Sequence, residues 1–177
     1  MTITLRDATP ADHAAILALN LESEALLSPM DAARLIELEA MAALHRVAVE
    51  DGKVVAFLLA FREGADYDSP NYRWFAARYQ RFLYVDRIAV SAACQGRGLG
   101  VKLYEDLFAH ARRERIEHLA CEYYIAPFNE ASSRHHARFG FVEVGRQWVA
   151  DGRKQVSLQV APSGFTPDSV AAGYKES

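Results

Sequence analysis

The stretch FLYVDRIAVSAACQGRGLGVKL, residues 82–103, decides the fold. Its beginning, Phe82–Val90, is apolar almost throughout, which is typical of a strand covered on both faces. A glycine-rich turn follows, and Val101–Arg115 then places apolar side chains at helical spacing. Glycines let backbone amides approach a ligand closely, and the start of a helix favours negative charge. We therefore predict that the turn binds an anion such as phosphate, helped by Arg97 and Lys102.

Two common nucleotide motifs do not fit this turn. A Walker loop requires Gly-Lys-Ser/Thr at the start of the helix, whereas Gly100 is followed by Val101. A dinucleotide fingerprint requires G-x-G-x-x-G, and the spacing of Gly96, Gly98 and Gly100 is one residue short. The turn therefore belongs to another class of phosphate-binding loop, or it binds no ligand at all.

The whole chain reads as strands and helices in the order β-α-α-β-β-β-α-β-α-β-β. The predicted strands cover residues 2–8, 45–50, 54–62, 82–90, 116–124, 141–149 and 155–161. The predicted helices cover residues 10–26, 31–43, 101–115 and 129–139. This mixed order predicts an α/β or α+β fold with one central sheet. We expect one domain over residues 1–161 and a loose tail over residues 162–177.

Composition excludes several classes of protein. The chain has 177 residues, of which 51% are hydrophobic, and a net charge of −3 at pH 7, so neither a disordered chain nor a general nucleic-acid binder is expected. The longest apolar run, Val54–Phe61, is too short to cross a membrane, and no signal peptide is visible. Two cysteines and no metal-ligand spacing predict a cytoplasmic protein without a bound metal.

The pattern Gln95-x-x-Gly98-x-Gly100, between a strand and an amphipathic helix, resembles the acyl-CoA loop of the GNAT N-acetyltransferase superfamily. The element order from residue 2 to about 161 resembles that family too. The resemblance implies a mixed, mostly antiparallel sheet with a splayed parallel pair, flanked by about four helices. It also implies that acetyl-CoA is the co-substrate. Its pantetheine arm would bond to the backbone of Ile88, Ala89 and Val90. Its pyrophosphate would bind amides of Gln95, Gly96, Arg97, Gly98, Leu99, Gly100 and Val101.

A second segment, Asn129–Phe141, resembles the family's later motif, in which an Asn precedes a helix that ends in Gly-Phe. The resemblance implies that Asn129 and Ser132 contact the cofactor. Family members often carry a Tyr seven residues after that Asn, where it reprotonates the CoA thiolate. This chain has His136 there, and an imidazole with a pKa near 6.5 could also donate a proton. Packing or hydrogen bonding beside CoA is the alternative role of His136.

N-acetylation requires a neutral amine, and a lysine-like amine is neutral only about once per 2,500 molecules at pH 7. A general base typically contributes about 10²–10⁴-fold. Asp86 and Glu122 are the candidates, because acids within apolar strands are uncommon without a role. A structural ion pair with Arg87 is the alternative for Asp86. Cys94 lies beside no His in the sequence, so direct transfer from acetyl-CoA is expected rather than a covalent route.

The segment of residues 63–80 is long for a connection, and long connections are often lids or binding elements. Asp66 could attract a cationic amine, while Tyr67, Tyr72 and Trp74 could line its pocket or lie over its charge. The alternative is that these aromatic side chains pack the segment onto the domain or form a homodimer contact.

We therefore expect an acetyl-CoA-dependent N-acetyltransferase that acts on a primary amine of a small molecule or peptide. Two alternatives remain at this stage, a non-catalytic acyl-CoA-binding module and an interaction domain that keeps only the fold. Neither nucleic acid nor a membrane is expected as a partner.

Overall fold

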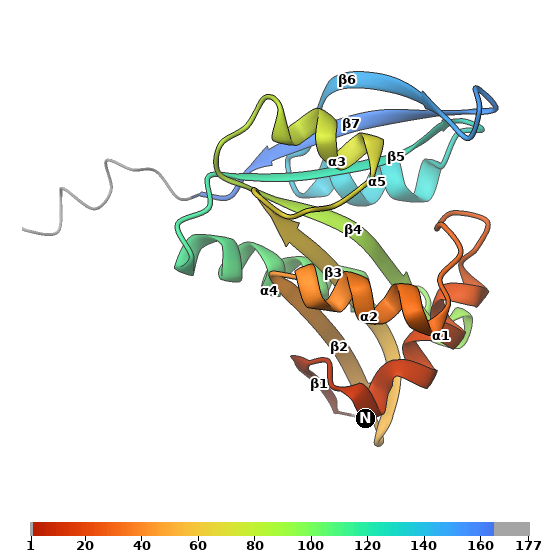
Figure 1. The fold of residues 1–177 in the computed structure, drawn as a ribbon. Coiled ribbons are helices and arrows are strands. Elements are labelled where there is room, and N and C mark those ends of the chain that lie inside the picture. Colours follow the sequence, from red (N-terminus) through yellow and green to blue (C-terminus); the bar gives the residue numbers. More distant parts are fainter. Residues whose placement is uncertain (1, 165–177) are drawn as a thin grey trace, which may run out of the picture. The chain divides into compact units, whose positions relative to one another are not determined.

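The computed structural model describes residues 2–164 (Figure 1). Residues 165–177, most of the predicted tail, lie outside the described residues. The strands are β1 (Ile3–Asp7), β2 (Leu44–Glu50), β3 (Lys53–Arg62), β4 (Phe82–Val90), β5 (His118–Ala126), β6 (Val142–Val149) and β7 (Lys154–Pro162). The α-helices are α1 (His13–Glu22), α2 (Ala32–Met41), α3 (Pro70–Ala76), α4 (Leu99–Arg113) and α5 (Glu130–Arg138). Two short 3-10 helices, η1 (Pro10–Asp12) and η2 (Ala92–Cys94), precede α1 and follow β4.

The strands form a 7-stranded sheet with the hydrogen-bonded order β1-β2-β3-β4-β5-β7-β6. β4 and β5 run parallel, whereas β1–β2, β2–β3, β5–β7 and β6–β7 are antiparallel. The expected mixed, mostly antiparallel sheet is therefore confirmed. The chain divides into two compact units, and β4 and α4 contribute residues to both.

The first unit comprises Met1–Asp68 and Val85–Asp106. Helices α1 and α2 lie against one face of β2 and β3 (Figure 1). The core beneath them joins apolar side chains from α1, α2 and three strands, namely Ile16, Leu19, Leu35, Val47, Phe57 and Ala89. On β2, Arg46 pairs with Asp7 of β1 and with Asp106 of α4, at 2.6 and 2.8 Å. These contacts join β1 and β2 to α4, the helix that follows the glycine-rich loop.

The second unit comprises Ser69–Tyr84 and Leu107–Ser177. Its parallel ladder pairs Phe82–Tyr84 of β4 with His118–Ala120 of β5. This ladder confirms the predicted parallel pair. Within the unit, α3 covers one face of the strands and α5 the other (Figure 1).

Helix α3 was not predicted, and it gives the described chain five α-helices where about four were expected. Its start carries a capping signal: the Ser69 hydroxyl accepts a hydrogen bond from the Tyr72 amide at 3.3 Å, and Pro70 occupies the first helical position. β7 is one residue longer at each end than the predicted strand 155–161, and Ser163 after it is buried, its hydroxyl donating to the Ile116 carbonyl at 2.5 Å.

Candidate active site

The glycine-rich loop has the backbone geometry of an anion cradle. Gly96 and Gly98 adopt φ values of +75° and +78°, which side chains other than glycine rarely accept. A Cβ at either position would meet no atom within 4 Å, so the loop surface is open. The first hydrogen bond from the α4 backbone runs from Lys102 to the Gly98 carbonyl at 3.0 Å. Within residues 2–164, the amides of Gly98–Val101 have no protein acceptor, and they suit a pyrophosphate.

The sequence predicted that Arg97 helps the turn to bind phosphate. In the structure its guanidinium already has a protein partner. Its two terminal nitrogens bond to both carboxylate oxygens of Glu50, with Nη1 to Oε2 at 2.9 Å. The Arg97 guanidinium lowers the pKa of Glu50, and the carboxylate raises the pKa of Arg97. Lys102 is exposed. Because the Arg97 guanidinium is already paired, the backbone amides are the main groups that the loop can offer to an anion.

The strand that leads into the loop is β4. It runs to Val90, and the Ser91 amide donates to the Val55 carbonyl of β3 at 2.9 Å. The resemblance implies that the backbone of Ile88, Ala89 and Val90 bonds to the pantetheine arm, and this contact stays a prediction.

Asp86 lies at the centre of a buried polar network in the first unit. Its side chain is only 6% exposed. Tyr67 donates its hydroxyl to Asp86 Oδ1 at 2.5 Å, and Arg87 donates Nε to Oδ2 at 2.7 Å. Arg87 also donates to Asn20 Oδ1 at 2.8 Å and to the Ser28 carbonyl at 3.2 Å. The ion pair with Arg87 exists, and Tyr67 gives Asp86 a hydroxyl through which a proton could pass.

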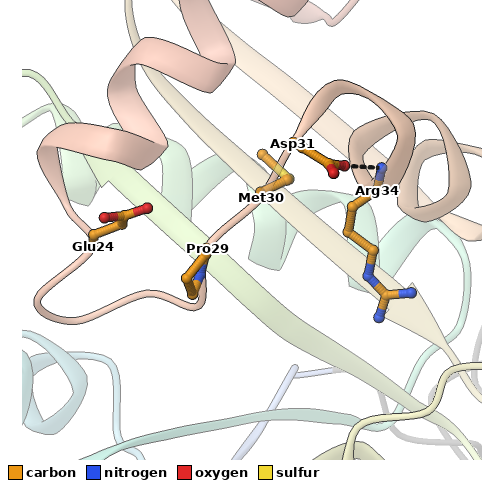
Figure 2. Close-up of a pocket in the computed structure, with 5 residues that line it drawn as sticks. All are labelled: Glu24, Pro29, Met30, Asp31 and Arg34. Carbon is orange, nitrogen blue, oxygen red and sulfur yellow. Dashed lines mark hydrogen bonds between the residues drawn. The ribbon is translucent and has the colours of Figure 1, made fainter.

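An open cavity of about 360 Å³ adjoins this network, lined by Glu24, Pro29, Met30, Asp31 and Arg34. Figure 2 shows Glu24 at one end of the cavity and the Arg34 guanidinium at the other. Two residues that line the cavity contact the network: Met30 Sδ lies 3.5 Å from Arg87, and Arg34 lies 5.6 Å from the centre of the Tyr67 ring. An amine in the cavity would therefore lie beside the side chains that hold Asp86.

The lining of this cavity is acidic on balance. Asp68 and Glu37 pair with Arg34 at 2.6 and 3.1 Å, which offsets its positive charge. Asp31 caps α2 by accepting from the Arg34 amide at 2.8 Å (Figure 2). Glu24 adds a further carboxylate. A protonated amine fits this balance of charge.

Glu122, the second predicted base, lies in the second unit on β5. Its Oε1 accepts from the hydroxyl of Tyr84, which is fully buried, at 2.8 Å. The two candidate bases are therefore similar in one respect: each carboxylate accepts a hydrogen bond from a buried tyrosine. Asp86 also forms an ion pair with Arg87 of its own unit.

His136 is buried between aromatic rings. It stacks on Tyr123 with ring centres 5.4 Å apart, and Phe141 meets it edge-on at 5.2 Å. Burial lowers its pKa to about 4, so the ring is neutral at pH 7. Nδ1 lies 2.7 Å from the Ser132 carbonyl, which can only accept, so Nδ1 carries the proton and Nε2 does not. This geometry favours the packing role of His136 over the acid role.

Asn129 occupies the cap of α5, as its place in the motif requires. Its Oδ1 accepts from the Ser132 amide at 3.1 Å, which is a helix cap. Its amide nitrogen is not used by that bond. A contact with the cofactor through Asn129 or Ser132 stays a prediction.

Most of the aromatic residues predicted for the acceptor pack against protein. Tyr72 is 2% exposed and lies 5.7 Å from Phe82 and 5.6 Å from Tyr84 between ring centres. Trp74 lies so close to Gly145 that a Cβ there would come within 2.7 Å of the indole. Tyr67 is buried too, with its ring centre 4.6 Å from that of Phe61, and in addition its hydroxyl bonds to Asp86. Asp66 is exposed.

Sequence reasoning missed Glu50, Asn20, Glu24 and Arg34. Glu50 looked like the end of a strand, and only contacts across the fold join it to the loop. The cavity residues could have been found in part, because the Ser28-Pro29-Met30-Asp31 stretch interrupts two helices with a turn signal.

In residues 2–164, no group of three or more His, Cys, Asp or Glu is arranged to hold a metal ion. No helix in that range is long and apolar enough to span a membrane.

Solved structures with the same fold are numerous. The Salmonella typhimurium protein YncA, solved with its cofactor acetyl-CoA, is 24% identical with a TM-score of 0.72, covering 94% of this chain and 96% of its own. The ribosomal-protein-S18-alanine N-acetyltransferase of Escherichia coli is 17% identical with a TM-score of 0.72, covering 94% and 97%. Ard1 from Thermoplasma volcanium is 16% identical with a TM-score of 0.75, covering 92% and 98%. At these identities the similarity establishes the fold.

No curated protein matches the chain in sequence. The model of the Acetyltransferase (GNAT) family, in contrast, matches residues 14–141. The match contains the open glycine loop, the strand that leads into it, Asp86 and the Asn129 cap. By this match over most of its length, the chain belongs to the GNAT acetyltransferase family.

Proposed function

We propose that the protein transfers the acetyl group of acetyl-CoA directly to a primary amine of a small molecule or peptide. The observation that carries the proposal is the run of amides at Gly98–Val101, at the start of α4, for which residues 2–164 provide no acceptor. When bound, acetyl-CoA supplies the activated acetyl thioester. The amides of residues 95–101 hold its pyrophosphate, and the backbone of Ile88–Val90 bonds to its pantetheine arm. An amide near Ala89 or Val90 stabilises the charge that develops on the thioester oxygen.

Asp86 serves as the proton acceptor in this proposal. The amine loses a proton to the Tyr67 oxygen while the Tyr67 hydroxyl proton passes to Asp86 Oδ1, over the 2.5 Å hydrogen bond that already joins them. The number of protons is conserved, and Tyr67 is regenerated. Arg87 and Asn20 hold the carboxylate in place. Glu122, with Tyr84, is the second candidate for the same role.

The cavity beside this network admits the acceptor. Its acidic lining attracts the amine in its protonated form, which is the dominant form at neutral pH. Met30 and Arg34 connect the cavity to Arg87 and Tyr67.

We place the protein in the bacterial cytoplasm, a reducing compartment that matches its two buried free thiols, Cys94 and Cys121. Neither a nucleic acid nor a membrane is required, and a homodimer is compatible with the exposed Trp148 and Val142 of β6.

The test is thiol release from acetyl-CoA with a panel of primary amines. Asp86→Asn is expected to lower kcat/KM by about 10²–10⁴-fold and to remove the rise of kcat/KM with pH that a general base produces. Glu122→Gln is the matched variant, since it neutralises the other tyrosine-bound carboxylate. An unchanged pH profile in Asp86→Asn would remove Asp86 from the mechanism, and a loss in Glu122→Gln alone would move the role to Glu122.

One observation favours a second function, a non-catalytic acyl-CoA-binding module. Both oxygens of Asp86 already accept hydrogen bonds, from Tyr67 and Arg87, as expected of a structural ion pair. This alternative predicts acetyl-CoA binding by calorimetry with no thiol release above the amine-free rate for any amine of the panel. The proposed enzyme predicts release with at least one of them.

A further inference from the structure

We infer that Glu50 is a positioning residue for the CoA loop, which holds Arg97 and thereby fixes the amides of residues 95–101 in the arrangement that receives the pyrophosphate. The inference rests on the proposed function. It goes beyond that function because Glu50 lies outside the glycine motif, on a different strand, and makes no contact with the ligand in this scheme.

The pair has the geometry of a clamp. Both terminal nitrogens of Arg97 bond to both carboxylate oxygens of Glu50, with Nη1 and Oε2 2.9 Å apart. Two parallel bonds fix the orientation of the guanidinium as well as its position. Nη1 also donates to Cys94 Sγ at 3.5 Å, so the same guanidinium reaches the turn in which the loop begins.

The two partners differ in rigidity. Glu50 is the last residue of β2, and the ladders place it opposite Ile3 of β1 and Lys53 of β3. Its side chain is 10% exposed, whereas that of Arg97 is 37% exposed. Arg97 itself lies between two glycines with positive φ, which hold the loop weakly by themselves. The anchored carboxylate therefore orders the loop, and the loop does not order the carboxylate.

The charges predict the direction of the effect. If Arg97 were a phosphate ligand and Glu50 its competitor, removal of Glu50 would free the cation and tighten binding. If the pair is a clamp, the same change loosens the loop, and binding must then supply the free energy of ordering it. The extensive contacts of Arg97 with Glu50 and Cys94 favour the clamp.

The experiment measures acetyl-CoA affinity by calorimetry for the wild type and four variants. Glu50→Ala is expected to raise the Kd about 10-fold, and Glu50→Gln less, because the amide oxygen still accepts from Arg97. Arg97→Lys keeps the charge but loses the bidentate geometry, so it should match Glu50→Ala. A fifth variant, Arg97→Ala, completes the cycle: the double variant Glu50→Ala/Arg97→Ala should bind no more weakly than the weaker of Glu50→Ala and Arg97→Ala, since both remove one clamp.

Two further readouts separate positioning from general stability. With acetyl-CoA saturating, kcat and the KM for the amine should stay at wild-type values in Glu50→Ala. Hydrogen exchange of the amides of residues 95–101 should become faster in the same variant without ligand. The matched control is Asp12→Ala, which removes the bidentate pair with Arg6, at 2.7 and 2.8 Å, from the same unit. It should lower the Tm and leave the Kd unchanged.

An unchanged or lower Kd in Glu50→Ala, or single effects that add in the double variant, would overturn the inference. Wild-type protein that binds no acetyl-CoA would instead contradict the proposed function, and the hydrogen-exchange comparison still decides whether Glu50 orders the loop.

Discussion

The loop of residues 95–101 and the segment of residues 63–80 both stand out in the sequence, and the structure treats them in opposite ways. In the loop, the amides of Gly98–Val101 have no protein acceptor within residues 2–164. In the segment, the conspicuous side chains have protein partners: Tyr67 bonds to Asp86, and Trp74 packs on Gly145. One region leaves backbone groups open, whereas the side chains of the other already have protein partners, Trp74 in packing and Tyr67 beside the proposed base.

The two regions differ in the groups that could contact a ligand, which are backbone amides in the loop and side chains in the segment. A loop that binds through its backbone needs only glycines and a helix start, and both are local features of the sequence. A site that binds through side chains depends on which partners the fold brings to them.

Gly98→Val is expected to raise the Kd for acetyl-CoA at least about 100-fold. Gly98 has a φ of +78°, which a β-branched residue adopts only at a cost of roughly 1–2 kcal/mol, and the relaxed backbone would turn several amides away from the pyrophosphate. Calorimetry measures the affinity. Gly152→Val is the matched control, because Gly152 has a φ of +79° and equally open surroundings in a distant turn. An equal loss of affinity in both variants would show that backbone strain at any such glycine lowers the affinity, and that the loop has no special role in binding.

The segment that follows β5 should make stability depend on pH. Burial lowers the pKa of His136 to about 4 from 6.5, so between these values the unfolded chain binds a proton that the folded chain does not. The free energy of unfolding is therefore expected to be complete above pH 6.5 and to fall by up to about 3 kcal/mol as the pH drops to 4. Burial lowers the pKa of His45 and His135 in the same direction.

Urea unfolding of the wild type and His136→Gln over this pH range measures the effect. The variant should lose a large part of the slope while the slopes from His45 and His135 remain. Equal slopes in the two proteins would contradict a buried, neutral His136 and would revive its role as the acid.

Gly145→Ala is expected to lower the free energy of unfolding by about 1–3 kcal/mol, because the added Cβ would lie 2.7 Å from the Trp74 ring. The Arg78 guanidinium lies over the indole ring, 4.0 Å from its centre, which limits the movement of the ring. The KM for the amine should be unchanged. In the double variant Gly145→Ala/Trp74→Ala the alanine at 145 should cost little more than Trp74→Ala alone. A raised KM without loss of stability would assign Trp74 to the acceptor site instead.

The same contrast explains how much the sequence could predict. The strand, the glycines and the helix of residues 82–113 follow local rules, so the loop and the order of strands were predictable. Helix α3 was missed because the aromatic residues after Ser69-Pro70 suggested a binding element and drew attention from a capping signal. The partnership of Glu50 with Arg97 joins residues 47 positions apart, and no local pattern reports it. The neutral state of His136 depends on Tyr123 and Phe141, which only the fold brings to it.

The central claim is that the backbone of residues 95–101 receives the pyrophosphate of acetyl-CoA. Titration of ¹⁵N-labelled protein with CoA tests it most directly, since each amide reports its own environment. We expect the largest changes of chemical shift at the amides of residues 95–101, with smaller changes at Ile88–Val90. Saturable binding with the loop amides unchanged, or no binding at all, would contradict it.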